Sequence, residues 1–71
     1  MSKTIRWSFE WNDSQKVGHI NYLMYDVIKN IKYWRHSKGS NGWYTIKEFE
    51  NYNEALDFGS DYADNKTTIN K

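Results

Sequence analysis

The sequence predicts an α+β fold in which a small antiparallel sheet of two or three strands is covered on one face by two helices. Three observations lead to this prediction: a strictly alternating segment, a segment with helical periodicity, and a short aromatic segment followed by a capping motif. The predicted order is β-α-(β)-β-α, where the bracketed strand is optional. A chain of 71 residues suffices for one domain, and we expect residues 1–71 to form it, with residues 65–71 as a frayed polar tail.

The first strand is predicted over residues 5–11. Apolar side chains occupy every second position of this segment, with polar or charged residues between them. The apolar positions are Ile5, Trp7, Phe9 and Trp11. A period of two in residues that favour strands indicates a half-buried strand. The following segment, residues 12–14, is typical of a turn and a helix N-cap.

A long helix is predicted from about residue 15 to about residue 34. Apolar residues recur here at spacings of three and four and occupy an arc of about 120° on a helical wheel, the width of a core-facing stripe. These residues are Val17, Ile20, Met24, Val27, Ile28, Ile31 and Trp34. One alternative stays open: residues 31–36 form a strand that pairs with residues 43–46, and the helix ends near residue 30. We prefer the longer helix, because Ile31 and Trp34 continue the stripe.

A further strand is predicted over residues 43–49, which are rich in aromatic and β-branched side chains. We expect Tyr44 and Ile46 on one face of this strand. The opposite face would carry Trp43, Thr45 and Phe49.

A second helix is predicted to begin after Asn51. Asn51 and Glu54 have the spacing of a capping box, in which the side chain of the first residue bonds to the backbone of the second. Residues at helical spacing would then share one face: Tyr52, Ala55, Leu56, Gly59, Tyr62 and Ala63. The predicted core of the domain consists of Trp7, Phe9, Trp11, Ile20, Met24, Val27, Ile31, Ile46, Leu56 and Tyr62.

Composition excludes several classes of protein. Cysteine is absent, which excludes disulfides and cysteine-based zinc sites, and His19 and His36 lie at no metal-ligand spacing. We therefore expect no metal and no cofactor. No segment approaches the ~20 apolar residues of a membrane span, and the first residues lack the apolar run of a secretion signal. These features predict a cytoplasmic protein without membrane contact, located in the host cytoplasm if a phage encodes it.

The predicted first helix carries an aromatic and cationic face opposite its apolar stripe. Tyrosine is a preferred interface residue, because its rigid ring and polar tip lose little entropy on binding. A chain this short has little material to cover a helix on both sides. We therefore predict that this face binds a partner, although the second helix could instead cover it. This face carries Tyr22, Tyr25, Lys29, Lys32 and Tyr33, and the predicted partner-binding residues are these five together with Trp34 and Arg35 at the end of the helix.

Charge is unevenly distributed although the net charge is +1. Residues 1–47 contain eight Lys/Arg and three Asp/Glu, a net charge of +5, and residues 48–71 contain two Lys and six Asp/Glu, a net charge of −4. A basic-aromatic run over residues 29–38 contains the cations Lys29, Lys32, Arg35 and Lys38. These cations either complement the dipole of the predicted helix or contact nucleic-acid phosphates, with Trp34 stacking on bases.

The predicted second helix carries a secondary acidic face. Its members recur at spacings of three, four and three: Glu54, Asp57, Asp61 and Asp64. This face is either solvated, or it meets the basic run within the chain or across a dimer, or it contacts a partner.

No nucleophile, general base and pocket coincide in the sequence, so we predict that the protein is not an enzyme. The prediction is a small protein-binding module with a larger protein partner, which forms a homodimer. Proline is absent and Asn, Lys, Ile and Tyr are frequent, a bias typical of AT-rich phage and mobile-element genes. The concrete form of the prediction is therefore a phage or mobile-element inhibitor that occludes a host enzyme or defence-system protein. The alternative is a small nucleic-acid-binding protein that uses the run 29–38.

Overall fold

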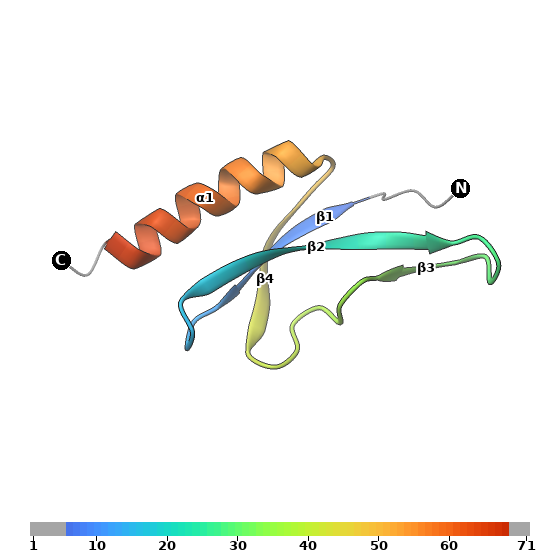
Figure 1. The fold of residues 1–71 in the computed structure, drawn as a ribbon, viewed down its shortest axis with the longest axis horizontal. Helices are drawn as coiled ribbons and strands as arrows, with labels where there is room; N and C mark the ends of the chain where they lie inside the picture. The colour runs from blue at the N-terminus through green and yellow to red at the C-terminus, as the bar shows by residue number, and fades with distance from the viewer. Residues whose placement is uncertain (1–5, 69–71) are drawn as a thin grey trace.

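The computed structural model describes residues 6–68 as a four-stranded antiparallel sheet with one helix (Figure 1). The elements are β1 (Trp7–Asn12), β2 (Val17–Asp26), β3 (Ile31–Trp34), β4 (Trp43–Phe49) and α1 (Tyr52–Thr68). The strands lie in the order β3-β2-β1-β4. The predicted arrangement of two or three strands with two helices is therefore wrong. The molecule is elongated, with extents of 50 × 25 × 13 Å.

The predicted first strand is confirmed as β1, which lies between β2 and β4 in the sheet. Alternation places Phe9 and Trp11 toward the helix, where both are buried, and Trp7 packs against them. Ile5, which we assigned to the same strand, lies outside the described residues. The period of two thus identifies the apolar face that packs against the helix, but the prediction of a half-buried strand is wrong, because the polar face is buried as well.

The predicted helix over residues 15–34 is wrong, because this segment forms a hairpin of β2 and β3. Its β-branched and aromatic residues favour strands, although their spacing also fits a helix. The turn decides between the two structures. The side chain of Asp26 accepts hydrogen bonds from the backbone N–H groups of Ile28 at 3.0 Å and Lys29 at 3.1 Å. Asn30 then adopts a φ of 55°, a left-handed conformation that no continuous α-helix contains.

The alternative prediction of a strand within residues 31–36 is confirmed for Ile31–Trp34, but its partner differs from the one we expected. β3 pairs with β2 and not with β4. Strand β2 consequently has two partners at different points along its length. β1 pairs with residues 17–22, and β3 pairs with residues 23–26.

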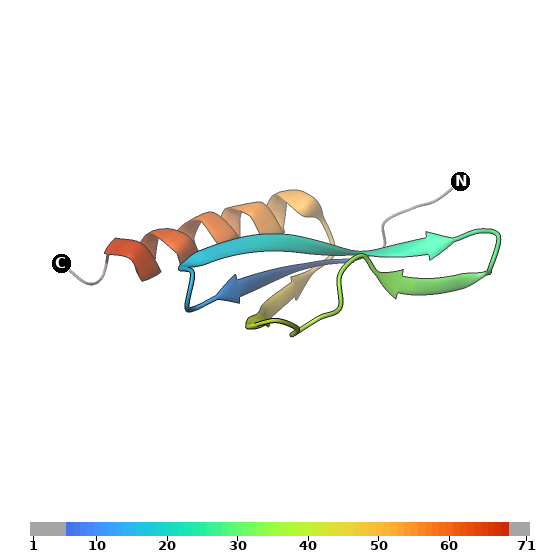
Figure 2. The same ribbon diagram turned by 60° about the horizontal axis from the view of Figure 1, so that its bottom comes forward.

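Helix α1 confirms the predicted second helix and its cap. The backbone N–H of Glu54 donates to Oδ1 of Asn51 at 2.8 Å. The helix covers one face of the sheet and contacts β1, β2 and β4 (Figure 2). It continues to Thr68, so the tail predicted over residues 65–71 is helical up to that point. Residues 69–71 lie outside the described part of the chain.

The core lies between α1 and the middle of the sheet. The rings of Phe9 and Trp11 lie 5.5 Å and 5.3 Å from the ring of Tyr62, measured between centroids. Gly18 and Gly59 lie against Phe9 from β2 and from α1. A Cβ added at Gly18 would lie 2.5 Å from the Phe9 ring, and one added at Gly59 would lie 2.7 Å from it. Glycine at both positions therefore allows the helix to approach the sheet closely.

The predicted core is confirmed only in part. The predicted residues that are buried or pack against the core are Trp7, Phe9, Trp11, Ile20, Ile46 and Tyr62. Leu56 lies at the margin of the helix and is 43% exposed. Met24, Val27 and Ile31 belong to the outer part of the hairpin, which α1 does not cover. We expected them in the core because we predicted a helix for this segment.

A β-bulge changes the predicted faces of β4. The pairing between β1 and β4 shifts by one residue, which leaves Ile46 without a direct partner. Phe49 therefore lies on the helix side of the sheet, with its ring centroid 5.3 Å from that of Phe58. We expected Phe49 on the opposite face with Trp43 and Thr45, which was wrong because simple alternation does not continue through a bulge.

Candidate functional site

Residues 23–34 form a two-stranded arm that projects beyond the rest of the molecule. The arm consists of the second half of β2, the turn over residues 27–30, and β3. Within the described chain, α1 makes no contact with β3. Figure 1 accordingly shows the turn of the arm and the helix at opposite ends of the molecule. Within residues 6–68, the helix therefore leaves the arm uncovered.

The residues predicted to bind a partner lie on the arm or at its base, but on two faces. Strand alternation and the pairing of β2 with β3 define these faces. Tyr22, Tyr33 and Arg35 lie on the face that continues the helix side of the sheet. Tyr25, Lys32 and Trp34 lie on the opposite face, and Lys29 lies in the turn. The single face predicted for a helix is therefore divided, since a strand pair separates residues that a helical wheel brings together.

The helix-side face of the arm combines aromatic rings with a cation. The guanidinium of Arg35 lies 5.4 Å from the ring centroid of Tyr22, within the range of a cation–π contact. The Tyr22 ring in turn lies 5.4 Å from the ring of Trp7, between centroids. Farther out along the arm, Met24 pairs with Tyr33 across the strands. This face therefore begins at the core and extends outward along the arm.

The tip of the arm is apolar. Ile28 in the turn is 96% exposed, and Val27, Ile31 and Tyr33 are also exposed. Single apolar residues are common on protein surfaces, but a group of them on one projecting element is typical of an interaction site. The turn that presents Ile28 is itself ordered by the side chain of Asp26.

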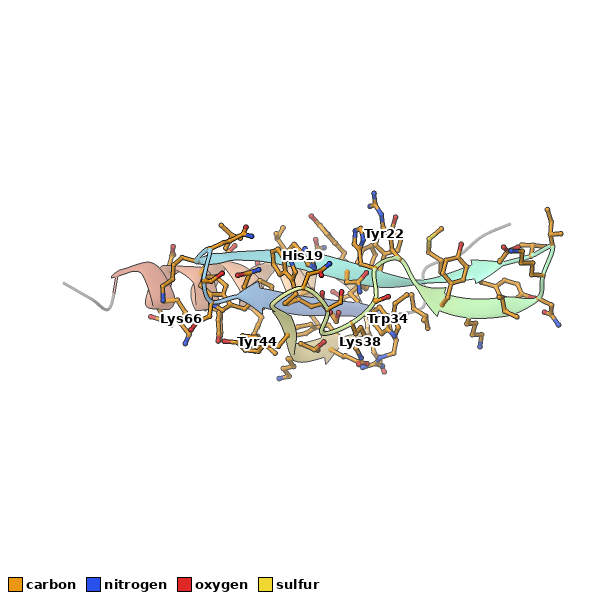
Figure 3. All side chains as sticks on the ribbon, turned by 90° about the horizontal axis from the view of Figure 1, so that it is seen from below. His19, Tyr22, Trp34, Lys38, Tyr44 and Lys66 are labelled. Atoms are coloured by element: carbon orange, nitrogen blue, oxygen red, sulfur yellow. The ribbon has the colours of Figure 1, made fainter. Side chains whose placement is uncertain are left out.

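The structure separates the cations of the basic-aromatic run 29–38. Lys32 and Arg35 lie on opposite faces, and Lys29 lies in the turn. Lys38 lies in the loop after β3, where its ammonium group contacts the carboxylate of Glu48 and lies 4.6 Å from the ring centroid of Trp34 (Figure 3). The run is therefore not a continuous basic stripe, and the carboxylate of Glu48 compensates one of its charges.

The secondary acidic face is present on α1 but does not meet the basic run within the described chain. Its residues are all on the exposed side of the helix: Glu54, Asp57, Asp61 and Asp64. The helix has no contact with β3 in residues 6–68, and Lys38 pairs with an acidic residue of β4 instead. The molecule thus has an acidic helix at one end and a cationic arm at the other.

The sequence did not predict a buried polar cluster under the loop that follows β3. The side chain of Glu10 is 1% exposed. Its Oε1 accepts a hydrogen bond from Nε2 of His19 at 2.8 Å, and its Oε2 accepts one from Oγ1 of Thr45 at 3.2 Å. The His19 ring stacks on Trp43 at 3.9 Å and on His36 at 5.8 Å, between centroids. A cavity of about 230 Å³ adjoins this cluster.

The cluster is buried because the loop covers the second face of the sheet. Ser8, Glu10 and Asn12 occupy the polar positions of β1, and all three are buried. The side chain of Asn21 holds the loop: its Nδ2 donates to the carbonyl of His36 at 2.8 Å, and its Oδ1 accepts from the N–H of that residue at 3.0 Å. Alternation marks these positions as polar, but no local signal in the sequence marks a loop as their cover.

The two histidines, which lie far apart in the sequence, are therefore close in space. Within residues 6–68, however, no three His, Cys, Asp or Glu side chains gather as a metal ion would require. In the same part of the chain, no helix has both the length and the apolar character that crossing a membrane requires.

Glu48 is the main ionic link between the covering loop and the sheet. Its carboxylate contacts Lys38 and accepts a hydrogen bond from Nε of Arg6 at 3.0 Å. The hydrogen bond from Lys38, assisted by Arg6, holds the pKa of Glu48 below its ordinary value of 4.5, although partial burial opposes the shift. A pKa that is lower in the folded state adds stability above pH 4.5, and this stability is lost as the pH falls through the folded-state pKa.

We therefore expect Glu48→Gln to lower the free energy of unfolding at neutral pH and to have a progressively smaller effect as the pH falls below 4.5. Urea denaturation of both proteins across this range measures the difference. Glu50→Gln, at an exposed position two residues along the chain, is the matched control and should show little effect at any pH. A cost of Glu48→Gln that persists unchanged in acid would contradict a role for the charge.

No family model, curated protein or solved structure matches this chain. The predicted binding residues lie together on the arm and at its base.

Proposed function

We propose that this protein is a non-enzymatic protein-binding module whose arm docks on a larger partner protein. The observation that carries the proposal is the apolar tip, where Ile28 is 96% exposed on an element that α1 does not cover. Burial of apolar surface contributes about 25 cal/mol per Å². A projecting tip gains this contribution only against a partner, because the described chain brings nothing over it.

The shape of the arm supports docking into a concave surface. A two-stranded ribbon is narrow enough to enter a cleft, and its rings and cations would then contact both walls. This geometry is compatible with occlusion of an enzyme. Inhibition of a host enzyme or defence-system protein, an origin in a phage or mobile element, a homodimeric state and a cytoplasmic location all stay predictions from the sequence.

Two features favour a protein partner over nucleic acid. Nucleic-acid binding relies on several cations that track a phosphate backbone. Here the cations of the run 29–38 are divided between two faces, the turn and a contact with Glu48. The end of the arm, which would enter first, is apolar, and the carboxylate of Asp26 lies directly beside the turn.

The proposal is tested with a double variant at the tip, Ile28→Ser with Ile31→Thr. We expect the free energy of unfolding of the variant to lie within about 0.5 kcal/mol of the wild-type value, since both residues are exposed. Its binding to a partner captured by the wild type from a lysate of the source cells should fall at least tenfold, because interface anchors contribute about 1–2 kcal/mol each.

The control is Val17→Ser, which removes an exposed apolar residue from the other end of β2. A photo-crosslinking residue at position 28 should join the partner to the arm. Capture of the same protein by the wild type, the control and the tip variant with equal affinity would show that the arm is not the docking surface. A salt-dependent gel shift with duplex DNA that the tip variant retains would favour the nucleic-acid alternative instead.

A further inference from the structure

Strand β2 has an unpaired edge in its first half. β1 pairs with one side of residues 17–22, whereas β3 occupies the other side only in the second half of β2. The chain leaves this edge after Arg35, whose backbone N–H donates to the carbonyl of Tyr22 at 2.8 Å. Asn21 then binds both backbone groups of His36 and directs the chain onto the opposite face of the sheet. In residues 6–68, no strand pairs with the edge that remains.

Strand geometry identifies the backbone groups at this edge. In an antiparallel pair, successive residues direct their N–H and C=O groups alternately to the two sides of the strand. The N–H of Leu23 donates to the carbonyl of Arg6, which precedes β1, so Leu23 faces the β1 side. Gly18 and Ile20 have the opposite parity and direct their N–H and C=O groups to the open edge. Such an edge is a template for another strand.

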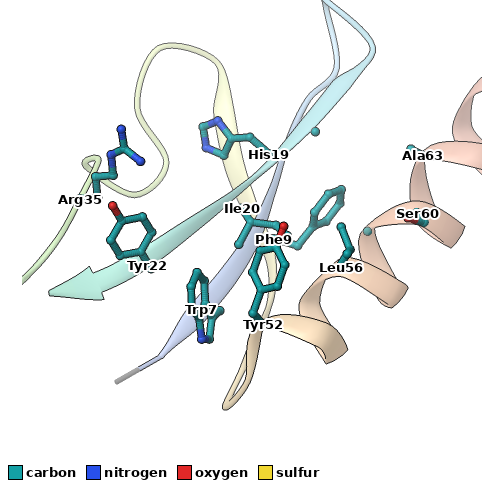
Figure 4. A pocket seen from close by; sticks show the side chains of 12 residues that line it. Trp7, Phe9, His19, Ile20, Tyr22, Arg35, Tyr52, Leu56, Ser60 and Ala63 are labelled. Carbon is teal, nitrogen blue, oxygen red and sulfur yellow. The ribbon is translucent and has the colours of Figure 1, made fainter. Parts of the chain in front are cut away.

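A groove of about 520 Å³ runs beside this edge, between β2 and α1 (Figure 4). Figure 4 shows Ile20 on the sheet side of the groove and Tyr52 and Leu56 on the helix side. Tyr52 and Leu56 are 45% and 43% exposed, although they line the groove together with the core residue Phe9. The groove therefore offers apolar walls to side chains that enter from the edge of the sheet.

A cation lies where the open edge ends. Arg35 lines the groove beside Tyr22. Within the described chain, no carboxylate lies at ion-pair distance from Arg35, whereas Arg6 and Lys38 both have Glu48 as a partner. An extended ligand in the groove would thus contact the backbone groups of the open edge and the apolar walls along its length. At the end of the edge it would contact the positive charge of Arg35.

We propose that this groove binds an extended segment of a partner protein, which adds a strand to β2 in line with β3. The segment carries apolar side chains at alternate positions, directed toward Tyr52 and Leu56, and an acidic side chain directed toward Arg35. The free N–H and C=O groups of Gly18 and Ile20 require an extended backbone, because a helix has no such groups to offer along its side. This surface is distinct from the arm tip, so its test is independent of the tip variants.

The first experiment uses fluorescein-labelled nine-residue peptides of alternating Val and Thr, with one Glu placed at each position in turn. Fluorescence anisotropy measures their binding to the full chain. We expect binding that depends on the position of the Glu. Two sets of peptides, N-methylated at the odd or at the even backbone nitrogens, should then behave differently. Methylation of the nitrogens that face β2 should lower the affinity at least tenfold, and methylation of those that face away should change it less than twofold.

The second experiment examines the protein side of the interaction. On peptide addition, the amide protons of Gly18 and Ile20 should become protected from hydrogen exchange in the wild-type protein. Ile20→Pro removes the N–H at the open edge without touching the ladder to β1 and should abolish binding. Ile20→Val is the matched control. Arg35→Glu should lower the affinity for the Glu-containing peptides about three- to fivefold and favour their Lys counterparts.

Three outcomes would overturn the proposal: no peptide binds, both N-methylated sets bind equally, or the amides of Gly18 and Ile20 keep their exchange rates on binding. A further outcome would replace it. If sedimentation shows a dimer that Ile20→Pro dissociates, and the peptides do not compete with it, a second copy of the chain occupies the edge. The tip variant, Ile28→Ser with Ile31→Thr, should leave peptide binding unchanged, which keeps this test separate from that of the arm.

Discussion

Gly59→Ala is expected to destabilise the protein by about 1–3 kcal/mol, although alanine is the better helix former. A Cβ at this position would lie 2.7 Å from the ring of Phe9. The ring cannot move away, because the backbone of Gly18 lies against it as well, where an added Cβ would lie only 2.5 Å away. The helix must therefore shift outward to accommodate a single methyl group.

The sign of this effect tests the packing of α1 on the sheet. Where nothing opposes the added methyl group, Gly→Ala in a helix stabilises a protein by about 0.5–1 kcal/mol. Urea denaturation measures the change, with Ser60→Ala at the adjacent exposed position as the matched control. In the Phe9→Leu background, Gly59→Ala should cost less, because the smaller side chain leaves room. An increase in stability from Gly59→Ala alone would show that the helix does not rest on Phe9.

Trp11→Ala is expected to leave the chain largely unfolded at 25 °C. Trp11 is fully buried, packs against Phe9 and Tyr62, and donates from Nε1 to the carboxylate of Asp13 at 3.2 Å. Truncation of a buried aromatic residue to alanine costs about 3–5 kcal/mol. The whole free energy of unfolding of a domain this small is about 3–5 kcal/mol, so one substitution removes most of it.

Far-ultraviolet circular dichroism and the dispersion of the amide NMR spectrum measure this loss of structure. Trp11→Phe is the control: it keeps a ring in the core and should remain folded with lower stability. A cooperative melting transition of Trp11→Ala close to that of the wild type would show that the core does not depend on this ring.

The elements that the sequence predicted correctly are those with an unambiguous local signal. β1 has a strict period of two, and α1 has a cap at Asn51 that the structure confirms. The segment over residues 17–34 had no such signal, because β2 and β3 carry apolar side chains on both faces and so show no period of two. The turns that precede β2 and β3 contain Lys16 and Asn30 at positive φ, where glycine would have marked them. A helical wheel therefore could not distinguish the two structures.

That the residues of the candidate site bind a partner stays a prediction, but their arrangement in space was not predictable from the sequence. Aromatic and cationic side chains between residues 22 and 35 indicated a binding surface, and they do share one projecting element. Their division between two faces follows from the strand pairing, which a helical wheel cannot represent. The polar cluster around Glu10 and the open edge at Ile20 depend on where β3 ends and where the next loop runs. These are long-range properties of the fold and have no local pattern.

Strand β2 passes from the body into the arm without interruption, and this continuity restricts how the arm can change in length. One residue inserted into each strand of the arm would exchange its two faces and turn Tyr33 to the other side of the molecule. Two residues inserted into each strand would lengthen the arm by about 6–7 Å and keep every side chain on its own side. Versions of this arm with different reach should therefore differ by even numbers of residues in each strand.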